Sequence, residues 1–87
     1  MFYFVYIIES DVDQSWYIGY TQDLKQRVKE HNQGKCTYTK KLGRKWRLIY
    51  AEFYRSKKDA LGREQFLKSG SGRRYIKKQL HYYLLEL

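Results

Sequence analysis

The chain has 87 residues, and its 18 Lys and Arg against 9 Asp and Glu give a formal net charge of +9. This length predicts one domain over residues 1–87, with a core so thin that large aromatic side chains must help to fill it. The single cysteine, Cys36, excludes a disulfide framework or a cysteine-based zinc cluster, and no segment reaches the roughly 20 apolar residues of a membrane span. The apolar start, Phe2 to Ile8, has no basic leader and is too short for a signal peptide, which favours the cytoplasm.

The first two elements are predicted to form a β-hairpin. Residues 2–8 are β-branched and aromatic on both faces, which indicates a central strand covered on both sides. The polar segment Ser10 to Ser15 is a turn by composition, and Trp16 to Tyr20 returns as a second strand. Gly19 within that strand indicates a close approach by another backbone or by a ligand.

A helix is predicted from a cap at Thr21 to about Asn32, with Gly34 ending it in a left-handed conformation. Leu24, Arg27, Val28 and His31 share one face of this helix because they are spaced at i, i+3, i+4 and i+7. Two of them, Arg27 and His31, therefore lie on or beside the buried stripe. They face the strand that precedes the helix, so we expect them to converge with Tyr17.

The rest of the chain predicts one more strand and two helices. A basic connection over residues 35–45 leads to a strand at Trp46 to Tyr54. A second helix starts at Ser56 or Lys57 and runs to about Ser69, the segment 70–72 breaks it, and a third helix covers residues 73–85. The predicted order is β-β-α-β-α-α, which is an α+β domain with a small three-stranded sheet flanked by helices.

Glu64 occupies the centre of the predicted apolar stripe of the second helix, which also carries Ala60, Leu61 and Leu67. A carboxylate in that position must be paired, hydrated or bound to a metal, since an isolated buried charge is very unfavourable. A salt bridge to Arg27 or to Lys68 is one interpretation. The other is a site for Mg²⁺, which keeps several waters and uses phosphate oxygens of a substrate as further ligands.

These residues resemble the GIY-YIG nuclease family. Val5-Tyr6-Ile7 and Tyr17-Ile18-Gly19 resemble its paired signature, although Phe4-Val5-Tyr6 lacks the glycine of the first motif. The Leu-x-x-Arg-Val-x-x-His helix and the Ala-Leu-Gly-Arg-Glu-Gln-Phe-Leu-Lys segment resemble its arginine and glutamate segments. The resemblance covers Tyr3 to about Lys77. It is greatest to small stand-alone bacterial members similar to the N-terminal domain of the nucleotide-excision-repair nuclease subunit.

The resemblance implies a three-stranded sheet flanked by helices and a metal-dependent endonuclease that hydrolyses nucleic acid, with DNA the first candidate and DNA repair one pathway. Glu64 would bind Mg²⁺ or Mn²⁺, and Arg27 would neutralise the phosphate as charge builds. Tyr6 would take a proton from the attacking water. Tyr17 would hydrogen-bond the phosphate or the water and could exchange roles with Tyr6, while His31 would orient the phosphate or accept a proton.

The choice of general base stays open among Tyr6, Tyr17 and His31. An unperturbed phenol has a pKa of about 10, so a tyrosine base needs cationic neighbours that lower its pKa. His31 is the better base on its reference pKa of about 6.5, whereas the resemblance places Tyr6 first. Given the resemblance, the expected nucleic-acid contacts are Lys35, Tyr38, Lys40, Lys41, Arg44, Lys68 and Arg73.

Two other functions are consistent with the charge. The chain could be a basic nucleic-acid-binding module on a nuclease fold that no longer cuts, or a basic domain that binds an acidic protein. A chain this small would take its sequence specificity from a partner protein or have little. The apolar tail His81 to Leu87 could cap the core or join two copies in a homodimer.

Overall fold

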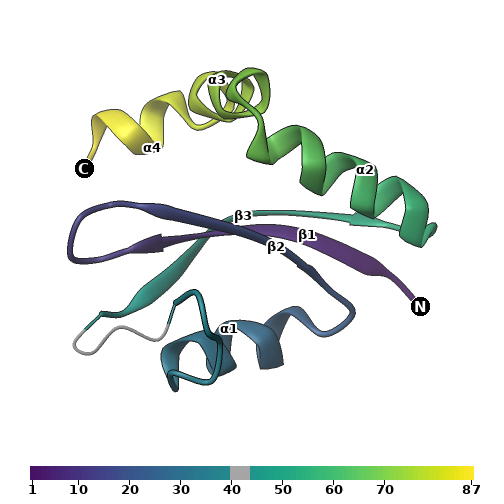
Figure 1. The fold of residues 1–87 in the computed structure, drawn as a ribbon. Coiled ribbons are helices and arrows are strands. Elements are labelled where there is room, and N and C mark those ends of the chain that lie inside the picture. The colour runs from purple at the N-terminus through teal and green to yellow at the C-terminus, as the bar shows by residue number, and fades with distance from the viewer. Residues whose placement is uncertain (40–43) are drawn as a thin grey trace.

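The computed structural model describes residues 1–39 and 44–87, and it has a three-stranded sheet between two layers of helices (Figure 1). Helix α1 covers one face of the sheet, and α2, α3 and α4 lie on the other. The elements are β1 (Tyr3–Ser10), β2 (Trp16–Thr21), α1 (Leu24–Asn32), β3 (Trp46–Tyr54), α2 (Lys57–Lys68), α3 (Gly70–Gln79) and α4 (His81–Leu85). The predicted α+β class and β-β-α-β-α-α order are confirmed, with a short extra helix at the end. No helix in the described part of the chain is long and apolar enough to span a membrane.

Strand β1 is the central strand, as its two apolar faces predict. The sheet order is β2-β1-β3, and both neighbours run antiparallel to β1. Val5 and Ile7 pack against buried side chains of α2 and α3, while Tyr6 and Ile8 pack with Trp46 on the α1 side. Each fully buried side chain of this kind contributes roughly 1.5–3 kcal/mol to the free energy of unfolding, compared with the same side chain left exposed. These two clusters hold the helical layers on the sheet.

The prediction that Thr21 caps the first helix is wrong, because Asp23 is the N-cap of α1. Its Oδ1 accepts a hydrogen bond from the Gln26 N–H at 3.1 Å, whereas Thr21 Oγ1 accepts from the Asp23 N–H at 3.1 Å. An N-cap side chain must reach the second or third helical N–H, and the helix begins only at Leu24. At the other end Gly34 has a φ of 74°, which confirms the predicted left-handed position.

The break after the second helix lies at Ser69, so the prediction that the segment 70–72 forms it is wrong, because that segment starts helix α3. Ser69 caps α3, and its Oγ accepts from the Gly72 N–H at 3.1 Å. Gly72 is buried against the end of α2, where a Cβ atom would lie 1.9 Å from the Phe66 carbonyl oxygen. The glycine therefore permits two consecutive helices to approach closely at a sharp corner.

The predicted helix over residues 73–85 is divided at Leu80 into α3 and α4, because Leu80 has φ −101° and ψ 27°, outside the helical region. Leu80 packs against the buried cluster of α2 and α3. In α4, Tyr83 donates its hydroxyl hydrogen bond to the buried Glu9 at the end of β1. The tail thus caps the core, as one of the two alternatives predicted. Tyr82 and Leu85 stay exposed, and association of two copies through them stays a prediction.

Candidate active site

The β-hairpin brings the two signature tyrosines together on the α1 face of the sheet. Their ring centroids lie 6.4 Å apart. Tyr6 is directly opposite Gly19 in the β1–β2 pairing, and a Cβ atom on that glycine would lie 2.6 Å from the Tyr6 hydroxyl oxygen. The close approach predicted at Gly19 is therefore real, but a side chain makes it rather than a backbone or a ligand. The absent side chain of Gly19 leaves room for the Tyr6 hydroxyl.

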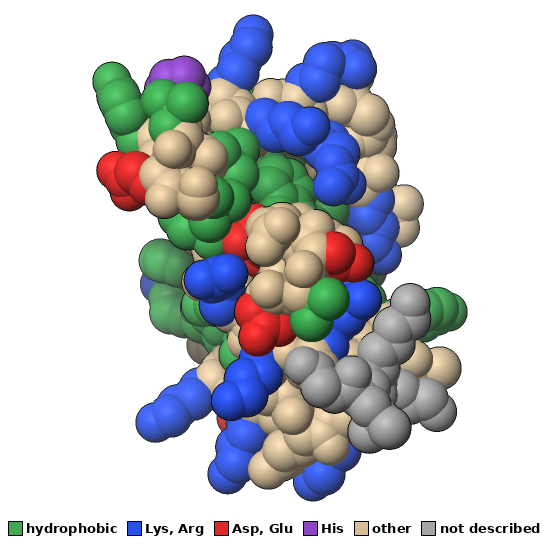
Figure 2. Space-filling model, turned by 90° about the vertical axis from the view of Figure 1, so that its left-hand side faces the viewer, with side chains coloured by type: hydrophobic (Ala, Val, Ile, Leu, Met, Phe, Trp, Pro, Cys, Tyr) green, Lys and Arg blue, Asp and Glu red, His purple; other side chains and the backbone are tan. Residues whose placement is uncertain are grey.

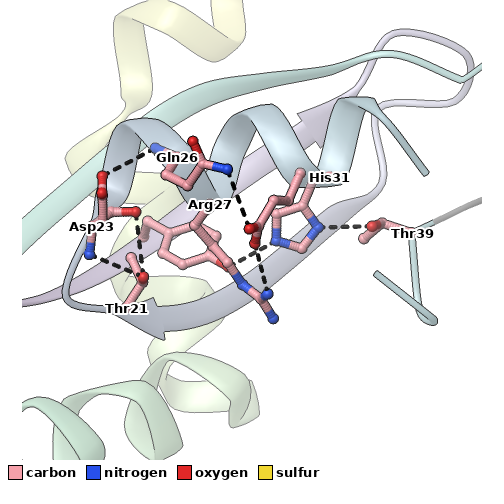
Figure 3. A network of polar contacts seen from close by, with 8 residues as sticks. Thr21, Asp23, Gln26, Arg27, His31 and Thr39 are labelled. Atoms are coloured by element: carbon pink, nitrogen blue, oxygen red, sulfur yellow. Dashed lines mark hydrogen bonds and ion pairs between the residues drawn. The ribbon is translucent and has the colours of Figure 1, made fainter. Parts of the chain in front are cut away.

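Helix α1 adds His31 to the pair, and this confirms the expected convergence of Tyr17 with the helix. The Tyr6 hydroxyl and His31 Nε2 are 2.8 Å apart, and the Tyr17 ring lies 4.8 Å from the imidazole, centroid to centroid. The other imidazole nitrogen, Nδ1, is 2.7 Å from Thr39 Oγ1 (Figure 3). His31 is only 1% exposed and Thr39 only 2%. A buried imidazole thus bridges two hydroxyl groups, one from β1 and one from the segment after α1.

Burial controls the protonation of this cluster. It lowers the pKa of His31 to about 4, and the nearby positive charge of Arg27 acts in the same direction. His31 is therefore neutral near pH 7, with one nitrogen as donor and the other as acceptor. Burial also raises the pKa of Tyr6 well above its ordinary value, although the Arg27 guanidinium lowers it. The Arg27 guanidinium acts on the pKa of Tyr6 in the direction expected of a cationic neighbour, but burial outweighs that charge.

Arg27 lies at the open side of the cluster, one helical turn before His31. Its side chain is 38% exposed, and its Nη1 is 3.2 Å from Glu30 Oε1. Arg27 and Glu30 line a surface pocket of about 350 Å³ together with Tyr20 and Gln26. An exposed ion pair of this kind contributes at most about 1 kcal/mol, so the guanidinium can leave Glu30 for a phosphate at little cost.

Glu64 belongs to the helical layer on the opposite face of the sheet, and its side chain is 13% exposed. Its Oε2 lies 3.3 Å from Lys68 Nζ, so the alternative of a salt bridge within α2 is observed, while Arg27 pairs with Glu30. No group of three or more His, Cys, Asp or Glu side chains that could hold a metal is present among residues 1–39 and 44–87. One carboxylate fits Mg²⁺ when waters and substrate phosphate oxygens complete the coordination.

The two faces meet at the free edge of β2. A pocket of about 400 Å³ there is lined by Trp16, Tyr17, Ile18, Tyr38, Lys68 and Arg73. Tyr17 contacts His31 on the α1 side, while Lys68 contacts Glu64 on the α2 side. The pocket therefore has residues of both halves of the predicted site in its walls.

The predicted nucleic-acid contacts that fall in the described part of the chain are Lys35, Tyr38, Arg44, Lys68 and Arg73. The other two, Lys40 and Lys41, lie outside the described residues. Three of the five line the pocket beside Tyr17, and Lys35 is exposed just after α1. Arg44 differs, because its side chain is only 15% exposed and pairs with Asp13 at 3.3 Å. Arg44 therefore ties its own segment to the β1–β2 turn through Asp13, and it is the least available of the five for contact with nucleic acid.

Sequence reasoning missed two buried polar residues. Thr39 contacts His31 from a polar connection that has no periodic pattern. Glu9 is fully buried at the end of β1, where it accepts from Trp16 Nε1 at 3.0 Å. An acidic residue that directly continues an apolar strand is a signal that could have identified Glu9, whereas no local signal marks Thr39.

Three comparisons with known proteins show what this chain is similar to. The family described as GIY-YIG catalytic domain matches residues 2–78. The UPF0213 protein YazA of Bacillus subtilis (strain 168) is 42% identical over 66 residues, which are 76% of this chain and 66% of that protein. A UPF0213 protein of Staphylococcus aureus (strain Mu3) is 40% identical over 67 residues, 77% of this chain and 80% of that protein.

A solved structure is also similar. It is the solution NMR structure of the UPF0213 protein BH0048 from Bacillus halodurans, which is 39% identical in sequence and has a TM-score of 0.55. The match covers 95% of this chain and 85% of that one. The fold described above is therefore shared with a protein of related sequence.

Proposed function

Because this chain belongs to the GIY-YIG family, whose members are generally nucleases that use divalent metals, we propose that it is a metal-dependent endonuclease acting on nucleic acid, with DNA the first candidate. The observation that carries the proposal is the buried Tyr6–His31 pair, with Tyr17 against the imidazole and Arg27 exposed beside it. A purely structural cluster would not need a cation held at the open side of three titratable rings.

The roles follow from what each side chain can reach. Arg27 is exposed enough to bind the scissile phosphate and neutralise charge in the transition state. Glu64 would hold Mg²⁺ or Mn²⁺, which would supply charge stabilisation to the leaving oxygen. Lys68 would have to release the Glu64 carboxylate for this.

Tyr17 rather than Tyr6 is the tyrosine that can contact a substrate. Tyr6 is 0% exposed, and its hydroxyl is committed to His31. Tyr17 is half-buried and lines the pocket at the edge of β2. We therefore assign to Tyr17 the contact with phosphate or water, and to the Tyr6–His31 pair the support behind it. This reverses the ranking that the family resemblance implies.

The test is nicking of supercoiled plasmid in Mg²⁺ or Mn²⁺, with EDTA as the metal-free reaction. Wild type should nick only with metal. Glu64→Ala should lower the rate by about 100-fold or more, because the metal ion that stabilises the negative charge on the leaving oxygen would no longer be held. Glu86→Ala, an exposed carboxylate outside the site, should keep the wild-type rate. Metal-dependent nicking that survives in Glu64→Ala would contradict the role of Glu64.

One observation favours the second candidate, a binding module that does not cut. The Glu64 carboxylate forms an ion pair with Lys68. Within the described residues, Glu64 is not part of a group of three or more side chains that could bind a metal. If wild type binds DNA in a salt-sensitive way but cuts neither plasmid nor branched substrates, this second function replaces the first.

A further inference from the structure

The pocket at the edge of β2 combines aromatic rings, an apolar floor and two cations beside Tyr17. We propose that this pocket binds one unpaired nucleotide next to the phosphate bound by the active site, with its base stacked between Tyr38 and Arg73. The pocket volume of about 400 Å³ lies in the range of small-ligand sites. The proposal deepens the proposed function, since it names the substrate feature that the site recognises.

Arg73 provides a preorganised platform for a base. Its guanidinium carbon lies 4.9 Å from the centre of the Trp16 ring, which is a cation–π contact. Trp16 is itself fixed, because its Nε1 donates to the buried Glu9 at 3.0 Å. A guanidinium held against the indole in this way is placed to stack with a nucleobase, as Arg planes do in the recognition of unstacked bases.

Tyr38 provides a second surface for stacking in the lining of this pocket, and it is 84% exposed. An exposed ring on a strongly basic surface is a typical stacking position for bases of single-stranded nucleic acid. Ile18, which is 9% exposed, adds an apolar side chain to the lining of the same pocket. These neighbours suit the faces and edges of a base better than they suit a bare phosphate.

Lys68 provides the charge for the phosphate of the same nucleotide. Its side chain is 49% exposed and contacts Glu64 at 3.3 Å. A base inside a duplex has both faces covered by its neighbours, so only an unpaired or extruded nucleotide can enter between Arg73 and Tyr38. The pocket thus favours single-stranded, flipped or terminal nucleotides over continuous duplex.

The experiment compares two single strands of about 12 nucleotides, one natural and one with every base replaced by an abasic residue, in EDTA so that nothing is cut. Fluorescence anisotropy with the full chain should show tighter binding of the natural strand. Tyr38→Leu should weaken binding of the natural strand by about tenfold, which is the range for loss of one stacked base. It should leave binding of the abasic strand unchanged, and Tyr38→Phe should behave as wild type.

Two matched controls make the result decisive. Tyr82→Leu removes another exposed tyrosine, 77% exposed on α4, and should not change binding of either strand. Arg73→Lys keeps the charge but removes the plane, so it should weaken binding of the natural strand only. Equal affinity of wild type for the two strands, or equal effects of Tyr38→Leu and Tyr82→Leu, would overturn the proposal.

The outcome is separable from that of the plasmid test. Base-dependent binding without any nicking would leave the nucleotide pocket standing and remove the nuclease function. Metal-dependent nicking with no difference in binding between natural and abasic strands would support the nuclease function and overturn the nucleotide pocket.

Discussion

At the residue scale, His31 is the centre of the candidate site. A neutral imidazole has one donor and one acceptor, so its contacts with Tyr6 and Thr39 must run in one direction. If His31 Nδ1–H donates to Thr39, then Nε2 accepts the hydrogen bond from the Tyr6 hydroxyl. In that arrangement the imidazole can act as the acceptor of the phenolic proton. The opposite direction makes Tyr6 an acceptor. We therefore expect Thr39 to act as a positioning residue, because its hydroxyl is the buried partner of His31 Nδ1.

The depressed pKa of His31 predicts a loss of stability in mild acid. The folded-state pKa is about 4 against a usual value of 6.5, so the unfolded chain binds an extra proton as the pH falls. Stability is full above about pH 6.5 and falls toward pH 4, by about 3 kcal/mol in total. Denaturant unfolding at pH 7, 6 and 5 should show this slope. His31→Gln should remove it, and His81→Gln, exposed on α4, should retain it.

Replacement of Thr39 tests the polar chain without changing its shape. Thr39→Val should lower the free energy of unfolding by about 1–3 kcal/mol, because His31 Nδ1 is left buried without a partner. Thr39→Ser should cost less, and ¹⁵N shifts of the imidazole should report a changed tautomer mixture only in the Val variant. Thr37→Val, exposed in the same segment, is the control. Equal costs at the two positions would show that the hydroxyl contact stabilises nothing.

At the scale of elements, the corner between α2 and α3 positions Arg73. Ser69 caps α3, and Gly72 packs on the end of α2, one residue before Arg73. The arginine lies on Trp16 of β2 because these two helices meet at close range. The corner thus connects the helical layer to the edge of the sheet where the pocket lies.

Gly72→Ala should destabilise the protein by about 1–3 kcal/mol or more, because the new methyl group meets backbone rather than a mobile side chain. Gly62→Ala is the matched control within α2. At Gly62 an added Cβ atom meets no other heavy atom of the described residues within 4 Å. It should therefore stabilise the helix by about 0.5–1 kcal/mol. Thermal unfolding of the two variants should shift in opposite directions, and a shared direction would contradict the close packing at the corner.

At the scale of the whole molecule, positive charge is spread over both helical layers. Figure 2 shows Lys and Arg side chains over the layer that contains α3 and over the layer that contains α1, with Asp and Glu side chains between them. Lys68 and Arg73, from the layer of α2 and α3, line the pocket at the edge of β2, and Lys35 is exposed just after α1. We therefore expect a bound nucleic acid to contact cations of both layers rather than those of a single helix.

Salt dependence measures how many of these cations contact phosphate. For about five contacts on duplex DNA, log Kobs should fall with log salt with a slope of about −4 to −5. Lys35→Gln should make the slope less negative by about 1. Lys57→Gln, at the far end of α2 from the pocket, changes the net charge equally and should keep the slope. The same change of slope in both variants would indicate a general effect of net charge, with no defined path of the nucleic acid over the protein surface.

The sequence by itself determined the strands, the first helix, the central place of β1 and the family, because periodicity, turn residues and motif spacing are properties of neighbouring residues. It also placed Tyr17, Arg27 and His31 in one strand–turn–helix unit. The short turn restricts where the helix can lie relative to the strand, so these three side chains lie near one another. Tertiary structure alone decided the contact of Thr39 with His31 and the cation–π contact of Arg73 with Trp16. Burial by distant elements also raised the pKa of Tyr6, whereas a tyrosine base would need that pKa to be lowered. These features depend on which remote groups exclude water from a side chain, and no local pattern encodes that.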